Sequence, residues 1–245
     1  MCYDDDSAPP VYGPPLTSAT GDQLTLTSAD GARFAAFHAV PAQPSGPGVV
    51  ILPDMRGLHP FYKNLAVRLA EQGHEAIAFD YFGRTAADDE RGADFNFMEH
   101  IRKLSREGIQ ADMLAAKERL GASEAVALGF CMGGRNAFHA AEPRFGFHGV
   151  IGFYGVPGIA GPYGPGPTQH AAELAGPILG LFGGADKGIP QSAVAEFDEA
   201  LNDAGVEHEL IVYPGAPHSF FDAKQDEHAQ ASADAWQRVL AFLRR

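Results

Sequence analysis

A cysteine lies in a glycine-rich segment whose spacing suits a nucleophile. The segment, Gly129–Gly134, reads Gly-Phe-Cys-Met-Gly-Gly and places a glycine two residues before and two residues after Cys131. It follows an apolar run at Ala125–Leu128 and precedes a stretch that we expect to be helical to about Ala141. A sharp strand-to-helix turn strains its central residue, and flanking glycines leave room for that turn. We therefore predict a nucleophilic thiol, while a small buried thiol in a turn is the simpler alternative.

The helix expected after Cys131 bears on the chemistry of its sulfur. The positive end of that helix would face the thiol and favour the thiolate. The backbone N–H of Met132 would then donate to a developing oxyanion. In α/β-hydrolases a second donor comes from the loop after an early strand, which here predicts the N–H of Met55. We thus predict an oxyanion hole formed by these two N–H groups.

An acid and a histidine follow the cysteine in the order that this chemistry requires. Asp186 comes soon after the apolar run Ile178–Phe182, and His218 soon after the expected strand Glu209–Tyr213. Nucleophile, acid and histidine follow one another in this order in α/β-hydrolases. The carboxyl ends of parallel strands meet at one edge, where such sheets bind ligands. Taken alone, Asp186 is more typical of a helix cap and His218 of a solvated loop. Together with Cys131 they predict a catalytic triad.

The elements that must position these side chains alternate between strands and helices. Apolar runs typical of strands buried on both faces occur at Val49–Leu52, Ala76–Phe79, Ala125–Leu128, Val150–Phe153 and Ile178–Phe182. Helical stretches are expected at Phe61–Gln72, up to Leu120 with a break near Gly108, at Gln191–Ala204 and at Gln225–Leu243. This alternation predicts an α/β-hydrolase fold, with a mostly parallel central sheet and helices on both faces.

The remaining segments are expected to be a hairpin, an arm and a long loop. Gln23–Thr27 and Arg33–Val40 predict two paired strands around the turn Asp30-Gly31. We expect residues 1–22 to form an irregular N-terminal arm and residues 23–245 a single domain. The segment Gly155–Gly176 is dense in glycine and proline, which suits either a rigid loop or a mobile lid.

Composition narrows the classes of function. The chain has 245 residues and a formal net charge of −13, which disfavours binding to nucleic acid or to a membrane surface. It shows no signal peptide and no apolar run long enough to span a bilayer, and its two cysteines, Cys2 and Cys131, fit a reducing compartment. The histidines lack metal-ligand spacing and no phosphate-binding loop occurs. We expect a cytoplasmic monomer or small homo-oligomer that acts on a small molecule without metal or cofactor.

Several of these segments together carry a resemblance to the dienelactone hydrolase family. They are Leu52–Gly57, Phe79–Tyr81, Gly129–Gly134, Asp186 and His218–Phe220, spread over most of the chain from about residue 23. The resemblance implies a hydrolase of cyclic enol-lactones or related esters, with a Cys–His–Asp triad and no cofactor. It also implies a carboxylate that contacts the resting thiol and releases it when substrate binds. That role would fall to Asp54, for which a turn residue or helix cap is the simpler alternative.

The chain departs from the family pattern where the substrate would bind. The family typically has glutamate at the position of Asp54, and a basic residue where this chain has Asp222. A rough alignment places Asp94 and Met98 where the family has an arginine and a tyrosine. Acidic side chains would repel an anionic substrate, so the resemblance implies the fold and reaction type more than the substrate. The arginines considered for a local positive pocket are Arg56, Arg84 and Arg135.

The resulting hypothesis is a hydrolase that cleaves a small ester or lactone through a thioester on Cys131. A broad carboxylesterase or a thioesterase with the same triad is the alternative among enzymes. A non-catalytic or redox-sensing relative, in which the thiol oxidises reversibly, is the alternative from another class. A metal hydrolase has little support, because no clustered Cys/His spacing occurs.

Overall fold

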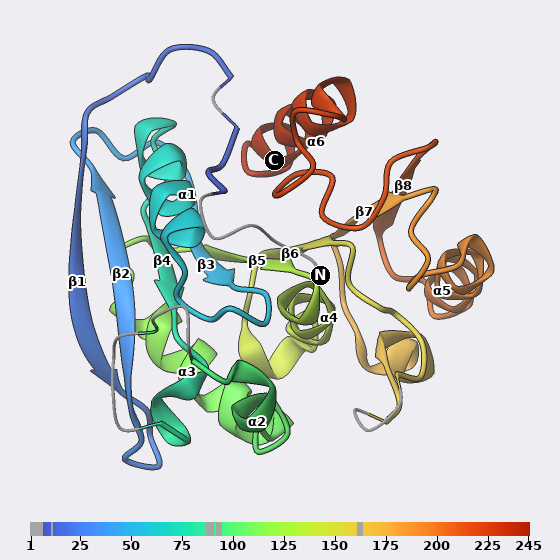
Figure 1. Cartoon of the computed structure of the whole chain (residues 1–245), viewed down its shortest axis with the longest axis horizontal. Helices are drawn as coiled ribbons and strands as arrows, with labels where there is room; N and C mark the ends of the chain where they lie inside the picture. The colour runs from blue at the N-terminus through green and yellow to red at the C-terminus, as the bar shows by residue number, and fades with distance from the viewer. Residues whose placement is uncertain (1–6, 11, 87–90, 92–94, 161–163) are drawn as a thin grey trace. The chain divides into compact units, whose positions relative to one another are not determined.

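The computed structural model describes residues 7–10, 12–86, 91, 95–160 and 164–245. The chain divides into two compact units, which are coloured by residue number in Figure 1. One unit comprises Gly13–Ala125. The other comprises Val126–Arg245 together with the N-terminal segment up to Tyr12.

The unit of residues 13–125 contains four strands in the order β1-β2-β4-β3. Their bounds are Ala19–Thr27 for β1, Arg33–Pro41 for β2, Gly48–Leu52 for β3 and Ala76–Phe79 for β4. The predicted hairpin of β1 and β2 is confirmed, with Gly31 in its turn at a φ of 87°. β1 begins four residues earlier than expected, because its first residues pair with the end of β2 at Pro41. β4 then pairs antiparallel with β2 and parallel with β3.

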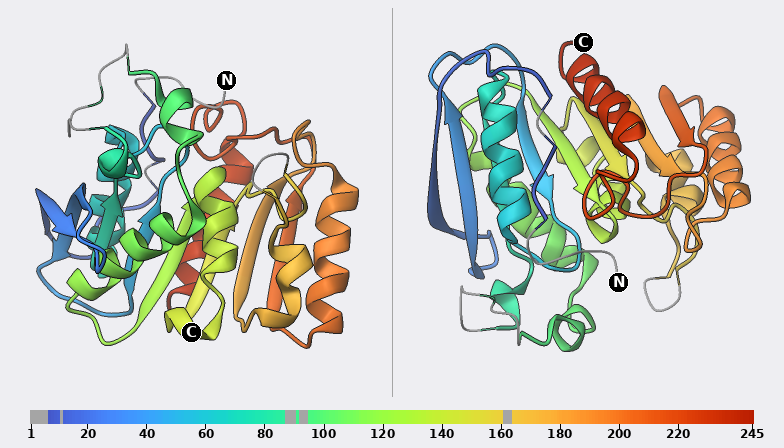
Figure 2. Two further views of the ribbon diagram at one scale, coloured as in Figure 1. Left: turned by 90° about the horizontal axis from the view of Figure 1, so that it is seen from below. Right: turned by 45° about the horizontal axis from the view of Figure 1, so that its top comes forward.

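The helices of this unit are α1 (Pro60–Glu71), α2 (Phe97–Ile101), α3 (Arg106–Arg119) and the short η1 (Phe82–Arg84). Figures 1 and 2 show α1 and α3 on opposite faces of these strands. The break in the helical sequence that was expected near Gly108 lies earlier in the chain, between α2 and α3. Ser105 caps α3 by accepting a 3.0 Å hydrogen bond from the N–H of Gly108, so this glycine lies in the first turn.

The other unit contains the strand run β5-β6-β7-β8, in which every pairing is parallel. The bounds are Ala125–Phe130 for β5, Gly149–Phe153 for β6, Ile178–Gly183 for β7 and His208–Tyr213 for β8. The first three are fully buried, as their apolar sequences predict, whereas β8 is half-buried. The remaining elements are α4 (Met132–His139), η2 (Pro143–Phe145), η4 (Pro167–Glu173), α5 (Gln191–Asp203) and α6 (Ala229–Phe242).

Helices α4 and α6 cover opposite faces of this strand run. A Cβ at Gly152 would overlap the ring of Phe138 from α4, and a Cβ at Gly149 would lie 2.8 Å from the ring of Phe242 from α6. Residues three apart in a strand point to opposite faces. The two glycines of β6 therefore let both helices approach the sheet closely.

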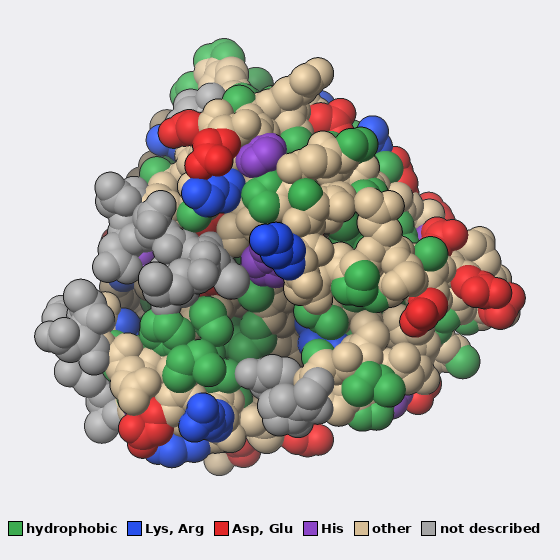
Figure 3. Space-filling model, turned by 45° about the vertical axis from the view of Figure 1, so that its right-hand side comes forward, with side chains coloured by type: hydrophobic (Ala, Val, Ile, Leu, Met, Phe, Trp, Pro, Cys, Tyr) green, Lys and Arg blue, Asp and Glu red, His purple; other side chains and the backbone are tan. Residues whose placement is uncertain are grey.

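On the face shown in Figure 3, acidic side chains lie mainly toward the edge of the view, and hydrophobic side chains gather nearer its middle. Among the described residues, no helix is both long enough and apolar enough to cross a membrane.

Candidate active site

Cys131 lies in the strained turn that the sequence predicts. Its backbone has a φ of 54° and a ψ of −113°, a conformation that L-residues rarely adopt, and it is the N-cap of α4. Its N–H donates to the carbonyl of Phe153 at 3.0 Å, which ties the turn to the end of β6. The thiol is half-buried. Strain of this kind persists only where surrounding contacts impose it, and it is concentrated at functional sites.

Two glycines make the turn sterically feasible. A Cβ at Gly129 would overlap the backbone carbonyl of Gly133. A Cβ at Gly134 would lie 2.6 Å from the carbonyl oxygen of Phe153 and 3.1 Å from Gly155. Because backbone atoms are what block these positions, side-chain rearrangement would not relieve the overlap. Glycine at positions 129 and 134 thus has a packing cause in this structure.

The predicted acid and histidine are in direct contact. His218 Nδ1 lies 2.6 Å from Asp186 Oδ2, and the other carboxylate oxygen accepts the N–H of Gly188 at 2.8 Å. The Asp186 side chain is 2% exposed and that of His218 is 23% exposed. The aspartate is therefore fixed beneath an imidazole that still reaches the surface.

All three predicted triad residues follow strands at the same edge of this unit. The register aligns the ends of the four strands. Phe130, the last residue of β5, pairs with Phe153 of β6. Phe153 pairs in turn with Leu181 of β7, and Leu181 pairs with Ile211 of β8. Cys131, Asp186 and His218 come after these positions on β5, β7 and β8 respectively. The carboxyl edge of a parallel sheet is where such folds place ligands.

Tyr154 is a site residue that sequence reasoning missed. It follows β6 at the same edge, has a φ of 38°, and its ring centroid lies 4.8 Å from that of His218. The same ring is 6.2 Å from Phe130 and 5.8 Å from Phe220. Tyr154 therefore lies between the residue before the cysteine and the loop of the histidine. The only sequence signal was its place directly after a buried strand.

The loop that carries Asp54 and Met55 is held within the unit of residues 13–125. The buried carboxylate of Asp54 accepts from Arg56 Nε at 3.0 and 3.1 Å and pairs with Arg56 Nη2 at 2.9 Å. Its backbone N–H donates to the Tyr62 hydroxyl at 3.1 Å, and the Tyr81 hydroxyl donates to the carbonyl of Pro53 at 2.8 Å. Asp54 thus has a local cationic partner. Its gating role and the oxyanion role of Met55 stay predictions, as does that of Met132, which is the first residue of α4.

Comparison with known proteins identifies the family. The family model described as "Dienelactone hydrolase family" matches residues 34–245. The chain belongs to this family. A protein of Escherichia coli (strain K12), provisionally named a carboxymethylenebutenolidase, is 31% identical over 234 residues, covering 90% of this chain and 86% of that protein.

Solved structures show the same fold. The crystal structure of a provisionally assigned dienelactone hydrolase from Klebsiella pneumoniae has a TM-score of 0.80 and 29% identity, covering 92% of this chain and 98% of the other. A dienelactone hydrolase-like promiscuous phosphotriesterase from metagenomic libraries, P91, has a TM-score of 0.75 at 22% identity, covering 92% and 98%. The predicted fold class, a mostly parallel α/β-hydrolase fold, is confirmed.

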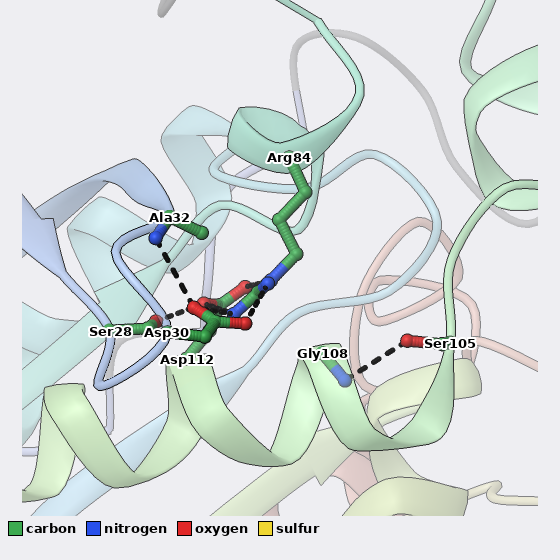
Figure 4. A network of polar contacts seen from close by, with 7 residues as sticks. All are labelled: Ser28, Asp30, Ala32, Arg84, Ser105, Gly108 and Asp112. Carbon is green, nitrogen blue, oxygen red and sulfur yellow. Dashed lines mark hydrogen bonds and ion pairs between the residues drawn. The ribbon is translucent and has the colours of Figure 1, made fainter.

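In this dienelactone hydrolase family member, the three arginines considered for a positive pocket each bind local partners. Arg56 pairs with Asp54, as described above. Figure 4 shows Arg84 reaching from η1 to Asp30 and to Asp112 of α3, at 2.6 and 2.8 Å. These carboxylates, Asp112 above all, raise the pKa of the Arg84 guanidinium above its usual value. Arg135 donates to backbone carbonyls.

The positions that depart from the family pattern differ in their surroundings. Asp222 is buried in the turn after the histidine, where its N–H donates to the carbonyl of Ser219 at 3.0 Å. Met98 is exposed on α2, and Asp94 lies outside the described residues. Within the described ranges, no three His, Cys, Asp or Glu side chains are grouped so that they would hold a metal ion.

Proposed function

We propose that this family member hydrolyses a small ester or lactone through Cys131, with His218 as base and Asp186 as the residue that orients it. The observation that carries the proposal is the 2.6 Å His218–Asp186 contact at the strand edge where the strained Cys131 turn also lies. A nucleophile, a base and a group that orients the base are the parts that covalent hydrolysis requires.

In the proposed reaction, His218 accepts the proton of the Cys131 thiol, or stabilises the thiolate as an ion pair. The sulfur attacks the carbonyl carbon, and the N–H of Met132 with that of Met55 holds the resulting oxyanion. Collapse breaks the ester bond, and the leaving alkoxide takes the proton from His218. Water, deprotonated by the same imidazole, then attacks the thioester. The acid leaves and the thiol is restored.

The chemistry of a thiolate favours esters and lactones over amides. Its attack on an ester yields an alkoxide or enolate, which leaves readily, whereas an amide nitrogen must be protonated before it leaves. The provisional name of the Escherichia coli relative, carboxymethylenebutenolidase, supports a lactone as substrate class. The acidic residue Asp222, where the family has a basic residue, favours an uncharged lactone over an anionic one, because like charges repel.

Turnover of a small panel tests the proposal. Dienelactone, an uncharged lactone and a simple aryl ester would be followed by ultraviolet absorbance with the wild type and with Cys131→Ala. We expect turnover of at least one substrate by the wild type and its loss in the variant. Full activity in Cys131→Ala would exclude the thioester mechanism. An acyl thioester is assayed beside the panel, and its turnover without turnover of the other three substrates would favour a thioesterase.

A further inference from the structure

Arg135 organises the loop that follows β6. Its guanidinium donates from Nη1 to the carbonyls of Val156 and Gly158, at 2.9 and 2.5 Å. From Nη2 it donates to the carbonyls of Gly164 and Pro165, both at 2.9 Å. The residue as a whole is 8% exposed. One buried side chain therefore joins two stretches of the Gly155–Gly166 loop, one on each side of residues 161–163.

The loop is packed against its arginine as well as hydrogen-bonded to it. A Cβ at Gly155 would lie 2.5 Å from the backbone nitrogen of Arg135. A Cβ at Gly166 would lie 2.6 Å from Arg135 Nη1 and would overlap the carbonyls of Pro157 and Gly158. By contrast, a Cβ at Gly158 would meet nothing within 4 Å. Gly155 is therefore packed against the backbone of the first turn of α4, and Gly166 against the guanidinium and the carbonyls of its own loop.

Arg135 and the loop that it binds are each connected to a candidate catalytic residue. Arg135 lies one helical turn after Cys131, and its N–H donates to the Cys131 carbonyl at 3.1 Å. The loop begins directly after Tyr154, whose N–H donates to Leu181 and whose ring packs on His218. Tyr154 is thus anchored on one side by β6 and β7, and on the other by the loop that Arg135 holds.

We propose that Arg135 is a positioning residue that fixes the Gly155–Gly166 loop to the first turn of α4 and so holds Tyr154 against the His218 imidazole. This inference rests on the proposed function of Cys131 and His218. Arg135 acts through Tyr154 and touches neither substrate nor reacting atoms. The described parts of the loop, residues 155–160 and 164–166, are then held in place beside the residues that follow β6.

The fork shape of the guanidinium is what the role requires. Four carbonyls around one side chain match the planar set of N–H donors of arginine, and a lysine ammonium offers only three donors from one point. Lysine would keep the charge but release part of the loop. Small displacements of groups around a reacting centre lower the rate of the chemical step more than they weaken binding.

The test uses two variants that loosen the contact from opposite sides. Arg135→Lys changes the donor, and Gly166→Ala crowds the acceptors while leaving the arginine in place. Gly158→Ala, in the same loop, and Arg144→Lys, a more exposed arginine paired with Glu142, are the matched controls. We expect Arg135→Lys and Gly166→Ala to lower kcat roughly tenfold or more while KM changes by less than about threefold. The controls should match the wild type.

A second readout does not depend on ester turnover. In a Cys2→Ser background, the rate of iodoacetamide alkylation of Cys131 would be measured against pH. We expect the pH of half-maximal alkylation to rise in Arg135→Lys and in Gly166→Ala, because a displaced imidazole stabilises the thiolate less well. If Arg135→Lys does not fold, Gly166→Ala gives the same test with the arginine present.

The outcomes separate this inference from the proposed function. A lower melting temperature with unchanged kcat and an unchanged alkylation profile would show that Arg135 is only structural, and would overturn the proposal. If the wild type hydrolysed no ester, the proposed function would fail. The alkylation profile would then still decide whether Arg135 governs the environment of the thiol.

Discussion

The carboxylate of Asp186 divides its oxygens between two neighbours. One accepts from the backbone of Gly188 and so fixes the carboxylate, and the other contacts His218 Nδ1. Because a carboxylate oxygen only accepts hydrogen bonds, the proton of a neutral imidazole lies on Nδ1 and leaves Nε2 as the base. In the proposed mechanism, Asp186 thus selects the tautomer of His218 as well as the orientation of its ring.

Asp186→Asn tests this role with almost no change in shape. An amide can present its N–H₂ to Nδ1 and favour the wrong tautomer, so we expect kcat to fall by roughly 10²- to 10⁴-fold. Asp198→Asn is the matched control, because Asp198 also contacts a histidine, His208, at 3.1 Å, but away from the site. Steady-state kinetics on the substrate turned over by the wild type would measure both. Near-wild-type turnover by Asp186→Asn would argue against the triad.

Gly129→Ala tests the packing cause of glycine at this position. The added methyl group would overlap the carbonyl of Gly133, and the nearest atoms that it would meet all belong to the backbone. We expect the free energy of unfolding in urea to fall by at least about 1–3 kcal/mol, as in overpacked cores. Gly158→Ala should lie within about 0.5 kcal/mol of the wild type, since its methyl group meets open space. An equally small effect at both positions would contradict the steric account.

For single residues, the sequence predicts candidate site residues whose positions follow a known motif or order along the chain. It misses candidate site residues that follow no such pattern. Cys131, Asp186 and His218 have fixed places relative to strands and helices, so their positions are readable from the chain. The roles proposed for Tyr154 and Arg135 depend on a positive φ and on backbone carbonyls of the loop after β6. Neither property is encoded in a local pattern, so the sequence indicated only that Tyr154 follows a buried strand and that Arg135 is one of three arginines considered for a positive pocket.

Among the elements, the buried strands were predictable because burial on both faces requires unbroken apolar runs. The bounds of β3, β4, β5, β6 and β7 agree with the expected runs to within two residues. Helix starts were less predictable, because caps decide them: Ser105 starts α3 ahead of the expected break at Gly108. The turn η4, Pro167–Glu173, lies inside the segment expected to be irregular, since glycine and proline content hides short helical turns.

Asp80, directly after β4, connects three segments of its unit. Its Oδ2 accepts the N–H of Phe82 at 3.0 Å and pairs with Arg91 at 2.9 Å. Its Oδ1 lies 3.5 Å from the N–H of Leu58, in the loop that follows Asp54 and Met55. Burial raises the pKa of the Asp80 carboxyl above its usual 3.8. Ionisation of this group is therefore costly in the folded protein.

The raised pKa predicts how Asp80 contributes to stability as pH changes. Between 3.8 and the raised value, the folded protein binds the proton more tightly than the unfolded chain does. The stability contributed by Asp80 therefore falls as pH rises through this window. The quantity to follow is the difference in free energy of unfolding between the wild type and Asp80→Asn. We expect this difference, wild type minus variant, to decrease as pH increases. Urea unfolding from about pH 4.5 to about pH 8 would measure it.

The exposed Asp22 of β1 supplies the control for this experiment. Asp22→Asn removes a carboxyl that is exposed on the strand, and it is measured over the same pH range. If the Asp80 difference instead grew with pH, the carboxylate form would be the stabilising one. The pair with Arg91 would then outweigh burial.

For the whole molecule, alternation of strands and helices was enough to predict the fold class, because few architectures bury such strands. The charge of the molecule bears on its substrate. The net charge is −13, and the described contacts of Arg56 and Arg84 include buried or half-buried carboxylates of their own unit. The negative net charge of the protein therefore repels an anionic substrate, whereas it does not affect the approach of an uncharged substrate.

Ionic strength separates the two substrate classes. Salt screens exposed charges over about 10 Å at about 0.1 M, so repulsion of an anionic substrate should weaken as salt is added. We expect kcat/KM for an anionic lactone to rise severalfold between about 20 mM and about 500 mM NaCl, and kcat/KM for a neutral lactone to stay constant. Stopped-flow or steady-state absorbance with both substrates on one enzyme sample would measure this. A fall in kcat/KM for the anionic lactone would instead indicate a positive pocket at the site, strong enough to overcome the net charge.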